Sequence, residues 1–433
     1  MLIAALFACE PGSDGSTPKD TPSTTEPTDP TTSDPTDTTP TTSDPVTFHQ
    51  HVAPLLGESC ARCHNPVGLG PGDYLDYATA SAWAEVMIDR IDAGEMPPPA
   101  ADPACHPYQD AEVYQVNPAL RDLLQRWVDQ GKPEGDAASA PPIDPWVPES
   151  FDAYDLELRA KGTVVPQFQD GNEYRCFLLG DITEDTYATG VEFLMDHPEV
   201  SHHALLLLDT NGGNESNVED EASGSWPCGL TDMPGSIVHA WAPSNGATRF
   251  PEGTGLRLPA GSQLVLQMHY FQSTSEVPAD RPGYGLTLSQ TVDKELYYLP
   301  VGPTFFSIPA GDPDFTKTFT APLWLLGLSG GLDVWGVFPH MHVLGTAYDF
   351  HAEADDGTEK CISQASEYDF SMQPTYWFDE PVHLDGTDSV SVACTWDNSA
   401  ENPLQMNDPP ENVTWGENTQ QEMCYAFFYV TVD

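Results

Sequence analysis

The sequence predicts a multidomain protein in which a small all-α domain precedes two all-β domains of the jelly-roll or sandwich type. The chain has 433 residues, and a typical domain uses about 100–200 residues. Helical apolar periodicity is confined to a segment before residue 135, whereas the later chain consists of short apolar runs bounded by Gly, Pro, Asp and Asn. With 10 Trp, 18 Phe and 16 Tyr, the chain has enough large apolar side chains to build several cores.

The charge is strongly one-sided and excludes two classes of partner. The 67 Asp and Glu residues outnumber 15 Lys and Arg, for a formal net charge of −52. Such a chain is repelled by nucleic acid and by anionic membrane surfaces. The 13 His nearly equal the whole basic complement. Because imidazole is a common metal ligand, this excess makes metal binding the first function to test.

The first 46 residues predict an export signal followed by a tether. Residues 1–9 form a short apolar run that ends at Cys9 and resembles the tail of a bacterial lipoprotein signal, although a chance apolar start is the alternative. Residues 10–46 are nearly all Thr, Pro, Asp, Ser and Glu, a composition that cannot build a core. We therefore expect an exported outer-membrane lipoprotein, periplasmic or at the cell surface, whose only membrane contact is a lipid anchor on Cys9.

The segment 47–135 contains a pattern that predicts covalent haem. Cys60 and Cys63 are three residues apart and His64 follows at once, so two thioethers and an axial imidazole can form on one face. A zinc knuckle would need two further soft ligands nearby, and none is suitably spaced. Met96, in a proline-rich segment, is the expected second axial ligand, because its competitor Met87 lies inside a predicted helix and suits the core. The apolar spacing predicts helices over Thr79–Ala93 and Pro118–Gln130. The segment resembles small class I-like c-type cytochromes.

After a linker over residues 136–159, strand-sized apolar runs predict two β-sandwich domains, at 160–300 and 301–433. Among these runs are Ala204–Leu208, Gln263–Phe271, Asp333–Phe338 and Tyr425–Val432.

Histidines recur in this β region in three settings that together favour metal binding. His340 and His342 flank Met341, and on a strand residues two apart point to the same face. The adjacent His202 and His203 would splay on a regular strand, so joint ligation there requires a bulge or a strand end. His269 lies within another predicted strand. Sites rich in imidazole and free of thiolate suit copper or zinc, and a thioether ligand would favour copper.

Residues from about 160 to 433 resemble the copper type II, ascorbate-dependent monooxygenases, which include peptidylglycine α-hydroxylating monooxygenase and dopamine β-monooxygenase. The motifs occur in the family's order: His202-His203, Ile237–Ala242, Arg249–Gly255, Leu266–Tyr270, His340–Gly345 and Glu422–Tyr425.

This resemblance implies two copper ions held by two β-sandwich domains across a solvent-filled cleft. The electron-transfer copper would be bound by His202, His203 and His269. The copper that binds dioxygen and hydroxylates a C–H bond would be bound by the catalytic set His340, His342 and Met423. A thioether stabilises Cu(I), the state that must meet dioxygen, which is consistent with this assignment. Gln267, two residues before His269 on its strand, is a candidate support for the first site.

The cysteines are also consistent with an exported protein. Cys394 and Cys424 resemble a disulfide of the family beside the Met ligand, and Cys176 and Cys228 are a second candidate pair. Cys105 has no evident partner, and Cys361 is left unassigned.

The sequence departs from the peptide-acting members at the positions that grip a substrate carboxylate. Where those enzymes have Arg, Asn and Tyr, this chain has Phe338, Tyr425 and Phe427. Without an arginine clamp, a small neutral or apolar organic substrate suits the site better than a glycine-extended peptide.

The sequence therefore predicts an exported copper monooxygenase that uses dioxygen. Its external electron donor would be ascorbate or a redox protein, and the fused haem would relay electrons to His202, His203 and His269. Two alternatives of other classes stay open: a haem and copper electron-transfer or copper-binding surface protein without hydroxylase activity, and a glycan-binding or glycan-hydrolysing double sandwich. The last requires a carboxylate pair in a cleft, and the many acidic residues single out none.

Overall fold

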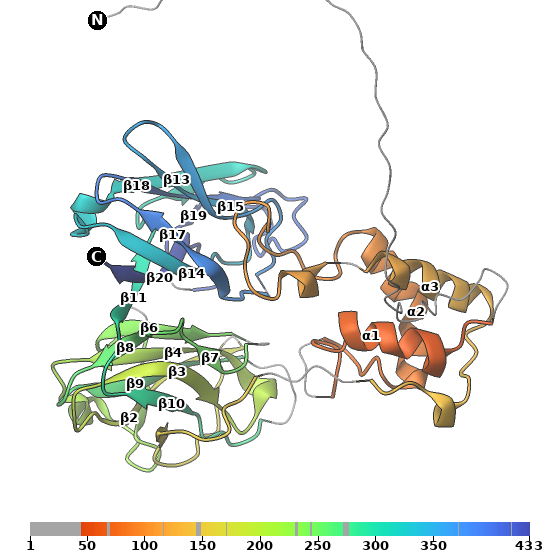
Figure 1. Ribbon diagram of the computed structural model, residues 1–433, viewed down its shortest axis with the longest axis horizontal. Helices are drawn as coiled ribbons and strands as arrows, with labels where there is room; N and C mark the ends of the chain where they lie inside the picture. Colours follow the sequence, from red (N-terminus) through yellow and green to blue (C-terminus); the bar gives the residue numbers. More distant parts are fainter. Residues whose placement is uncertain are drawn as a thin grey trace, which may run out of the picture. The chain divides into compact units, whose positions relative to one another are not determined.

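The computed structural model describes residues 45–433, except 67–69, 116, 144–148, 170, 230–232, 243–244, 272–276, 371 and 417 (Figure 1). Cys9 and nearly all of the predicted tether therefore lie outside the described residues. Within the described part, no helix has both the length and the apolar character needed to cross a membrane.

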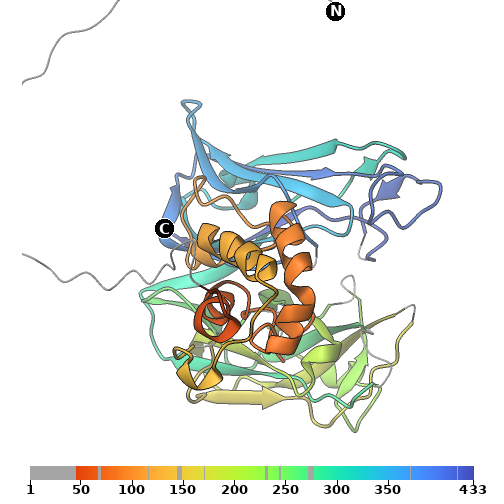
Figure 2. The same cartoon turned by 90° about the vertical axis from the view of Figure 1, so that its right-hand side faces the viewer.

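Three α-helices form the helical segment: α1 (Ala53–Ser59), α2 (Tyr77–Asp92) and α3 (Pro118–Asp129). They pack against one another and appear in orange tones in Figure 2. The Asp76 side chain caps α2 by accepting from the amide of Thr79. Asn117 caps α3 in the same way, and Pro118 takes the first helical position, where no amide donor is needed. Both predicted helices are confirmed, with ends shifted by at most two residues. The helices bury a core that includes Phe48, Leu56, Leu124 and Trp127.

The rest of the described chain is mostly β-sheet, as predicted. The strands are β1 (Leu156–Arg159), β2 (Asn172–Asp181), β3 (Thr186–Leu194), β4 (Ser201–Asp209), β5 (Ser225–Pro227), β6 (Ser236–Trp241), β7 (Thr248–Arg249), β8 (Thr254–Leu258), β9 (Gln263–Phe271), β10 (Gly283–Ser289), β11 (Lys294–Val301), β12 (Ser307–Ile308), β13 (Phe315–Pro322), β14 (Leu332–His340), β15 (Gly345–Glu353), β16 (Glu359–Ala365), β17 (Tyr376–Leu384), β18 (Ser389–Trp396), β19 (Val413–Thr414) and β20 (Tyr425–Val432). The four runs named from the sequence all lie in strands, and two of them coincide with β9 and β20.

One long sheet, ordered β1-β10-β3-β8-β11-β20-β14-β17 with β7 beside β3, serves two cores. The five-stranded sheet β5-β2-β9-β4-β6 shares a core with the first half of the long sheet, including Leu266 and Phe193. The four-stranded sheet β13-β18-β15-β16 shares another core with the second half, including Phe350 and Phe428. This arrangement is consistent with two β-sandwiches. The predicted boundary at residue 300 stays a prediction, because β11 pairs with β20 and the long sheet runs through both ranges.

Three disulfides join distant parts of the described chain: Cys105–Cys361, Cys176–Cys228 and Cys394–Cys424. The last two confirm the expected pairs, and the first supplies the partners that the sequence left unassigned. Cys105 belongs to the segment between α2 and α3, which also bonds to the second sandwich through the Asp102 amide and the Gln364 carbonyl (2.8 Å). Among the described cysteines, only Cys60 and Cys63 do not form a disulfide.

A buried histidine in the first sandwich predicts acid sensitivity. His239 on β6 is 3% exposed, and its Nδ1 lies 3.2 Å from the Tyr284 hydroxyl. Burial lowers the pKa of His239 from 6.5 to about 3. Between these values the unfolded chain binds the extra proton, so His239 makes stability fall as pH falls from 6.5 towards 3.

We expect the His239→Gln variant to flatten the pH dependence of the free energy of unfolding below pH 6.5. The slope should decrease by up to about 1.4 kcal/mol per pH unit, the value for one proton. Urea unfolding at a series of pH values measures it, with His351→Gln in the second sandwich as the control. Equal slopes in wild type and His239→Gln would contradict the prediction.

Candidate metal centres

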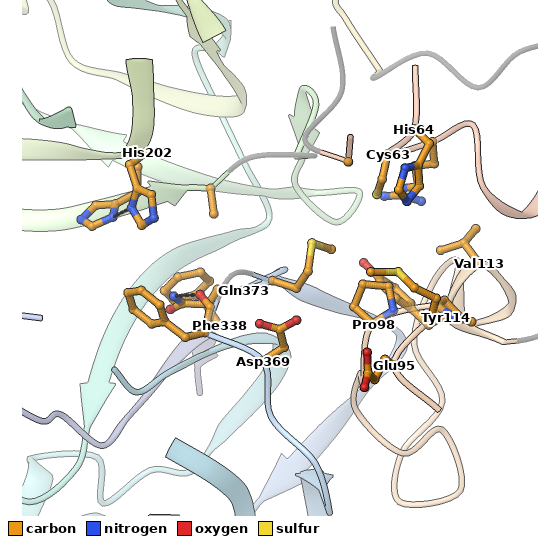
Figure 3. Close-up of a pocket in the computed structure, with 18 of the residues that line it drawn as sticks. Cys63, His64, Glu95, Pro98, Val113, Tyr114, His202, Phe338, Asp369 and Gln373 are labelled. Carbon is orange, nitrogen blue, oxygen red and sulfur yellow. Dashed lines mark hydrogen bonds between the residues drawn. The ribbon is translucent and has the colours of Figure 1, made fainter. Parts of the chain in front are cut away.

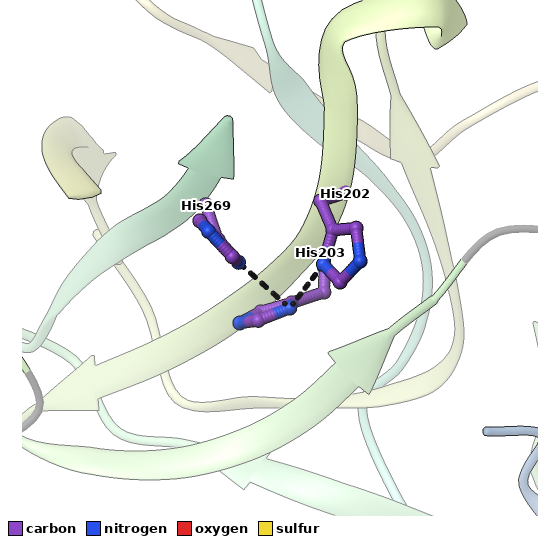
Figure 4. A group of neighbouring side chains, drawn as sticks. All are labelled: His202, His203 and His269. Carbon is purple, nitrogen blue, oxygen red and sulfur yellow. Dashed lines mark hydrogen bonds between the residues drawn. The ribbon is translucent and has the colours of Figure 1, made fainter. Parts of the chain in front are cut away.

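Three histidines converge at the ends of two neighbouring strands, β4 and β9 (Figure 4). Ser201 lies opposite Tyr270 and His203 lies opposite His269, so the register shifts at His202. This is the bulge that joint use of adjacent histidines requires. It turns both His202 and His203 towards His269, and one potential ligand atom from each lies within 4.8 Å of the others.

The nitrogen atoms of this group face one another. The Nδ1 atom of His203 lies 3.1 Å from Nδ1 of His202 and 3.3 Å from Nδ1 of His269. Two unprotonated nitrogens repel at such distances unless a proton or a cation lies between them. Burial, followed by the charges of His269 and His202, lowers the pKa of His203 well below its usual value. Neutral imidazole is the form that binds metals, so the geometry fits a copper ion bound through the three Nδ1 atoms.

Two residues of β2 orient His269. Its Nε2 atom donates to Asn172 Oδ1 at 2.8 Å, which leaves Nδ1 for a metal. The Tyr174 ring stacks on its imidazole, with ring centroids 4.2 Å apart. Gln267, which the sequence suggested as a support for this site, makes no hydrogen bond to these histidines. Its Nε2 lies 3.8 Å from Cys228 Sγ, and its buried Oε1 has no partner among the described residues.

Removing the Asn172 acceptor should weaken metal binding at the three histidines. We expect Asn172→Ala to lower the copper affinity of this site by about 10-fold, the low end for loss of an outer-shell partner. Competition titration with a chromophoric chelator measures the change, and Asn211→Ala, at an exposed position in the same sandwich, is the control. An unchanged affinity in Asn172→Ala would show that the hydrogen bond does not orient His269.

The second pair of histidines lies at the end of β14, where the predicted alternation of His340 and His342 along one strand is wrong. The strand ends at His340, so His342 lies beyond it in a turn and not two positions along the same strand face. The two imidazoles nevertheless face each other, with ring centroids 5.2 Å apart at 86°. The turn, rather than strand alternation, brings them together.

Both imidazoles use Nδ1 for hydrogen bonds to the protein, which leaves Nε2 to bind a metal. His340 Nδ1 donates to Gln373 Oε1 at 2.7 Å, and His342 Nδ1 donates to the Gln421 carbonyl at 2.9 Å. Burial, and then the charge of His342, lowers the pKa of His340 to about 3. Met423 is 4% exposed and lines the same cavity as His340. Two neutral imidazoles and a nearby thioether fit a soft copper site.

Glu422, next to Met423, stabilises the turn that contains His342 through buried hydrogen bonds. Its carboxylate accepts from the amides of His342 (3.0 Å) and Leu344 (2.8 Å) and from Trp396 Nε1 (2.8 Å). The disulfide Cys394–Cys424 joins Cys424, the residue after Met423, to β18. The backbone around His342 and Met423 is therefore held by one buried carboxylate and one covalent bond.

The Cys60–His64 motif fits a covalently bound haem. Neither thiol forms a disulfide, and burial followed by the charge of Cys63 raises the pKa of Cys60 to about 12. His64 Nδ1 donates to the Pro71 carbonyl at 3.1 Å, which leaves Nε2 able to bind iron. The His64 ring stacks on Tyr74 at 4.1 Å, and Gly70 allows the chain to pass, since a β-carbon there would lie 2.6 Å from His64 Nδ1.

One cavity of about 990 Å³ reaches residues of both the helical segment and the sandwiches (Figure 3). Cys63 and His64 lie at one side of the view, and His202, Phe338 and Gln373 lie at the other. The apolar residues Trp83, Val86 and Met96 line the helical side and are 37–40% exposed. A porphyrin would cover such side chains. Met87 also lines the cavity, so Met96 stays a prediction as axial ligand.

Three supporting residues were not predicted from the sequence: Asn172, Gln373 and Glu422. Glu422 carried a weak signal, because it is an acidic residue directly before the apolar run Met423–Val432. Asn172 and Gln373 carried none, since Asn172 reaches His269 across a sheet and Gln373 reaches His340 from a loop distant in sequence.

The fold and these side chains define a protein of paired β-sandwiches with two candidate histidine-rich metal centres. Residues 320–432 match the family model of the copper type II ascorbate-dependent monooxygenase C-terminal domain. The chain is also 25% identical over 312 residues to DBH-like monooxygenase protein 1 of Gallus gallus. That match covers 64% of this chain and 47% of the relative, so the chain spans about half the length of the curated relative. Both matches support the copper monooxygenase family.

Solved structures add no further argument. The VP2 subviral particle of infectious bursal disease virus matches with 12% identity and a TM-score of 0.17, covering 66% of this chain and 74% of that chain. Broad bean stain virus matches with 8% identity and a TM-score of 0.27, covering 69% and 95%. These scores are too low to support a shared fold.

Proposed function

We propose that the chain is an exported copper monooxygenase that hydroxylates a C–H bond of a small organic substrate. One atom of dioxygen would enter the product, and the other would leave as water with two electrons and two protons from a donor. The observation that carries the proposal is the presence of two histidine clusters that each leave ring nitrogens able to bind a metal. These nitrogens are Nδ1 in the first cluster and Nε2 in the second, in His202, His203 and His269 and in His340 and His342 respectively.

The two centres would have different roles. His202, His203 and His269 would hold the copper that passes electrons, and His340, His342 and Met423 would hold the copper that meets dioxygen. Bound copper would supply one-electron redox chemistry and dioxygen binding. The protein keeps the imidazoles neutral by burial and holds their orientation through Asn172, Gln373 and the Gln421 carbonyl.

The electrons would come from outside the sandwiches. The matched family is ascorbate-dependent, so ascorbate is one donor. A haem bound covalently by Cys60 and Cys63, with His64 and Met96 as axial ligands, would supply a second route on the same chain. The shared cavity supports this route, because it is lined by Cys63 and His64 as well as by His202 and His340.

A small neutral or apolar substrate suits the lining near Met423. Phe338, Tyr425 and Phe427 line the cavity there, and no arginine of the described residues after position 150 lines it. A carboxylate substrate would therefore lose its hydration without a bidentate partner. Export is supported by the three disulfides, since such bonds persist in oxidising compartments. An N-terminal lipid anchor on Cys9 is part of the proposal.

Metal analysis of exported, haem-loaded protein tests the proposal first, with one iron and two coppers per chain as the expected result. The second measurement is consumption of ¹⁸O₂ by the ascorbate-reduced protein with neutral alkylaromatic compounds, followed by mass spectrometry of the products. Absence of copper would reject the proposal. Copper with reversible redox cycling but no oxygen insertion across the panel would favour the electron-transfer or copper-binding alternative.

A further inference from the structure

The loop between β16 and β17 is anchored on the histidine pair of the second sandwich. Tyr368 OH accepts from the Met341 amide at 3.1 Å and donates to the Met341 carbonyl at 3.0 Å. Gln373 accepts from His340 and donates through Nε2 to the Phe370 carbonyl at 2.8 Å. The backbone of Phe370 is therefore held by the side chain that also orients His340.

From this anchored position, the Phe370 ring reaches the histidines of both centres. Its centroid lies 6.1 Å from the ring of His342 and 6.0 Å from the ring of His202. His202 belongs to β4 in the first sandwich, whereas Phe370 follows β16 in the second. A single aromatic side chain thus spans the gap between the two candidate centres.

An apolar ring at this point changes the physical character of the gap. The resemblance to the family implies a solvent-filled cleft, and here the Phe370 ring takes up part of the space between His202 and His342, at the wall of the cavity that it lines together with His202. Removal of water lowers the local dielectric constant and strengthens electrostatic interactions.

We propose that Phe370 is a positioning residue that fixes the spacing between the two copper centres and keeps water out of the gap between His202 and His342. The inference rests on the proposed function, because it requires copper at both sets of ligands. Phe370 holds no metal itself. Its ring acts as a spacer fastened to the second centre through Gln373 and in contact with the first through His202.

Pulsed EPR of the protein loaded with Cu(II) at both sites tests the spacer role without an activity assay. We expect wild type to give one narrow copper–copper distance, and Phe370→Ala to give a broad distribution. Electron spin echo modulation in D₂O should show more deuterium near copper in Phe370→Ala. Phe370→Leu, which keeps an apolar side chain, should stay close to wild type in both readouts. Phe305→Ala is the matched control, since Phe305 is 89% exposed.

The outcomes separate this inference from the proposed function. A wild-type protein that fails to bind two coppers would overturn both. Two coppers with the same narrow distance and deuterium signal in wild type and Phe370→Ala would overturn the spacer role alone. The spacer role would also be overturned if Phe370→Ala lost copper at the three histidines, or if Phe305→Ala broadened the distribution equally. Should Phe370→Ala fail to fold, Phe370→Asn provides the same loss of apolar volume and the same comparison.

Discussion

Replacing His340 with alanine is expected to abolish hydroxylation while the three-histidine centre keeps its copper. His340 lines the cavity, and its Nε2 is the nitrogen left for a metal once Nδ1 donates to Gln373. Loss of an outer-shell partner alone typically lowers affinity or activity by about 10–100-fold, so loss of a ligand should lower turnover by at least about 100-fold. Product formation under ascorbate, together with copper stoichiometry, measures the effect.

The matched control for this variant is His351→Ala. His351 lies in the same sandwich on β15, and its Nδ1 contacts Asp349 rather than the cavity. We expect two coppers and wild-type turnover for this control, and one copper with no turnover for His340→Ala. Turnover by His340→Ala above a tenth of the wild-type rate would remove His340 from the catalytic set.

Replacing both Cys60 and Cys63 with alanine is expected to remove covalent haem completely. These two cysteines are the ones in the described chain that form no disulfide, and each lines the cavity beside His64. Without thioether bonds, haem should dissociate on denaturation, which a haem-stained denaturing gel detects. Ascorbate-driven hydroxylation should continue in this variant, because ascorbate can reduce the copper centres without the haem.

Two methionine variants distinguish the axial ligand within the same experiment. Met96→Leu should change the haem absorption spectrum, whereas Met87→Leu should leave it unchanged, because Met87 is 6% exposed and packs in the helical core. The reverse pattern would assign the iron to Met87. A haem that stays covalently attached in the double cysteine variant would contradict the prediction altogether.

The His340→Ala variant also tests whether the haem passes electrons to the copper centres. If reduced haem reoxidises with dioxygen in wild type but not in His340→Ala, the haem donates to the copper centres. If reoxidation is the same in both proteins, the helical segment and the sandwiches do not exchange electrons. The disulfide Cys105–Cys361 keeps the segment after α2 attached to β16 during such measurements.

Local patterns in the sequence were sufficient for the secondary structure and for the identity of candidate ligands. Apolar spacing predicted α2, α3, β9 and β20, because helix and strand periods depend on near neighbours. The Cys60–His64 spacing and the three histidine settings were visible for the same reason, since each lies within a few residues of chain. The assignment of these residues to iron and copper stays a prediction.

Only the tertiary structure decided how those groups are brought together. The bulge at His202 depends on the register of β4 against β9, and the turn at His342 depends on Glu422, 80 positions further along the chain. The pairing of Cys105 with Cys361 and the reach of Phe370 to His202 likewise depend on contacts between distant segments. Such contacts are determined by sheet register and core packing, which no local pattern specifies. The sequence by itself thus determined which residues could bind metals, and the packing of the two sandwiches decided which of them meet.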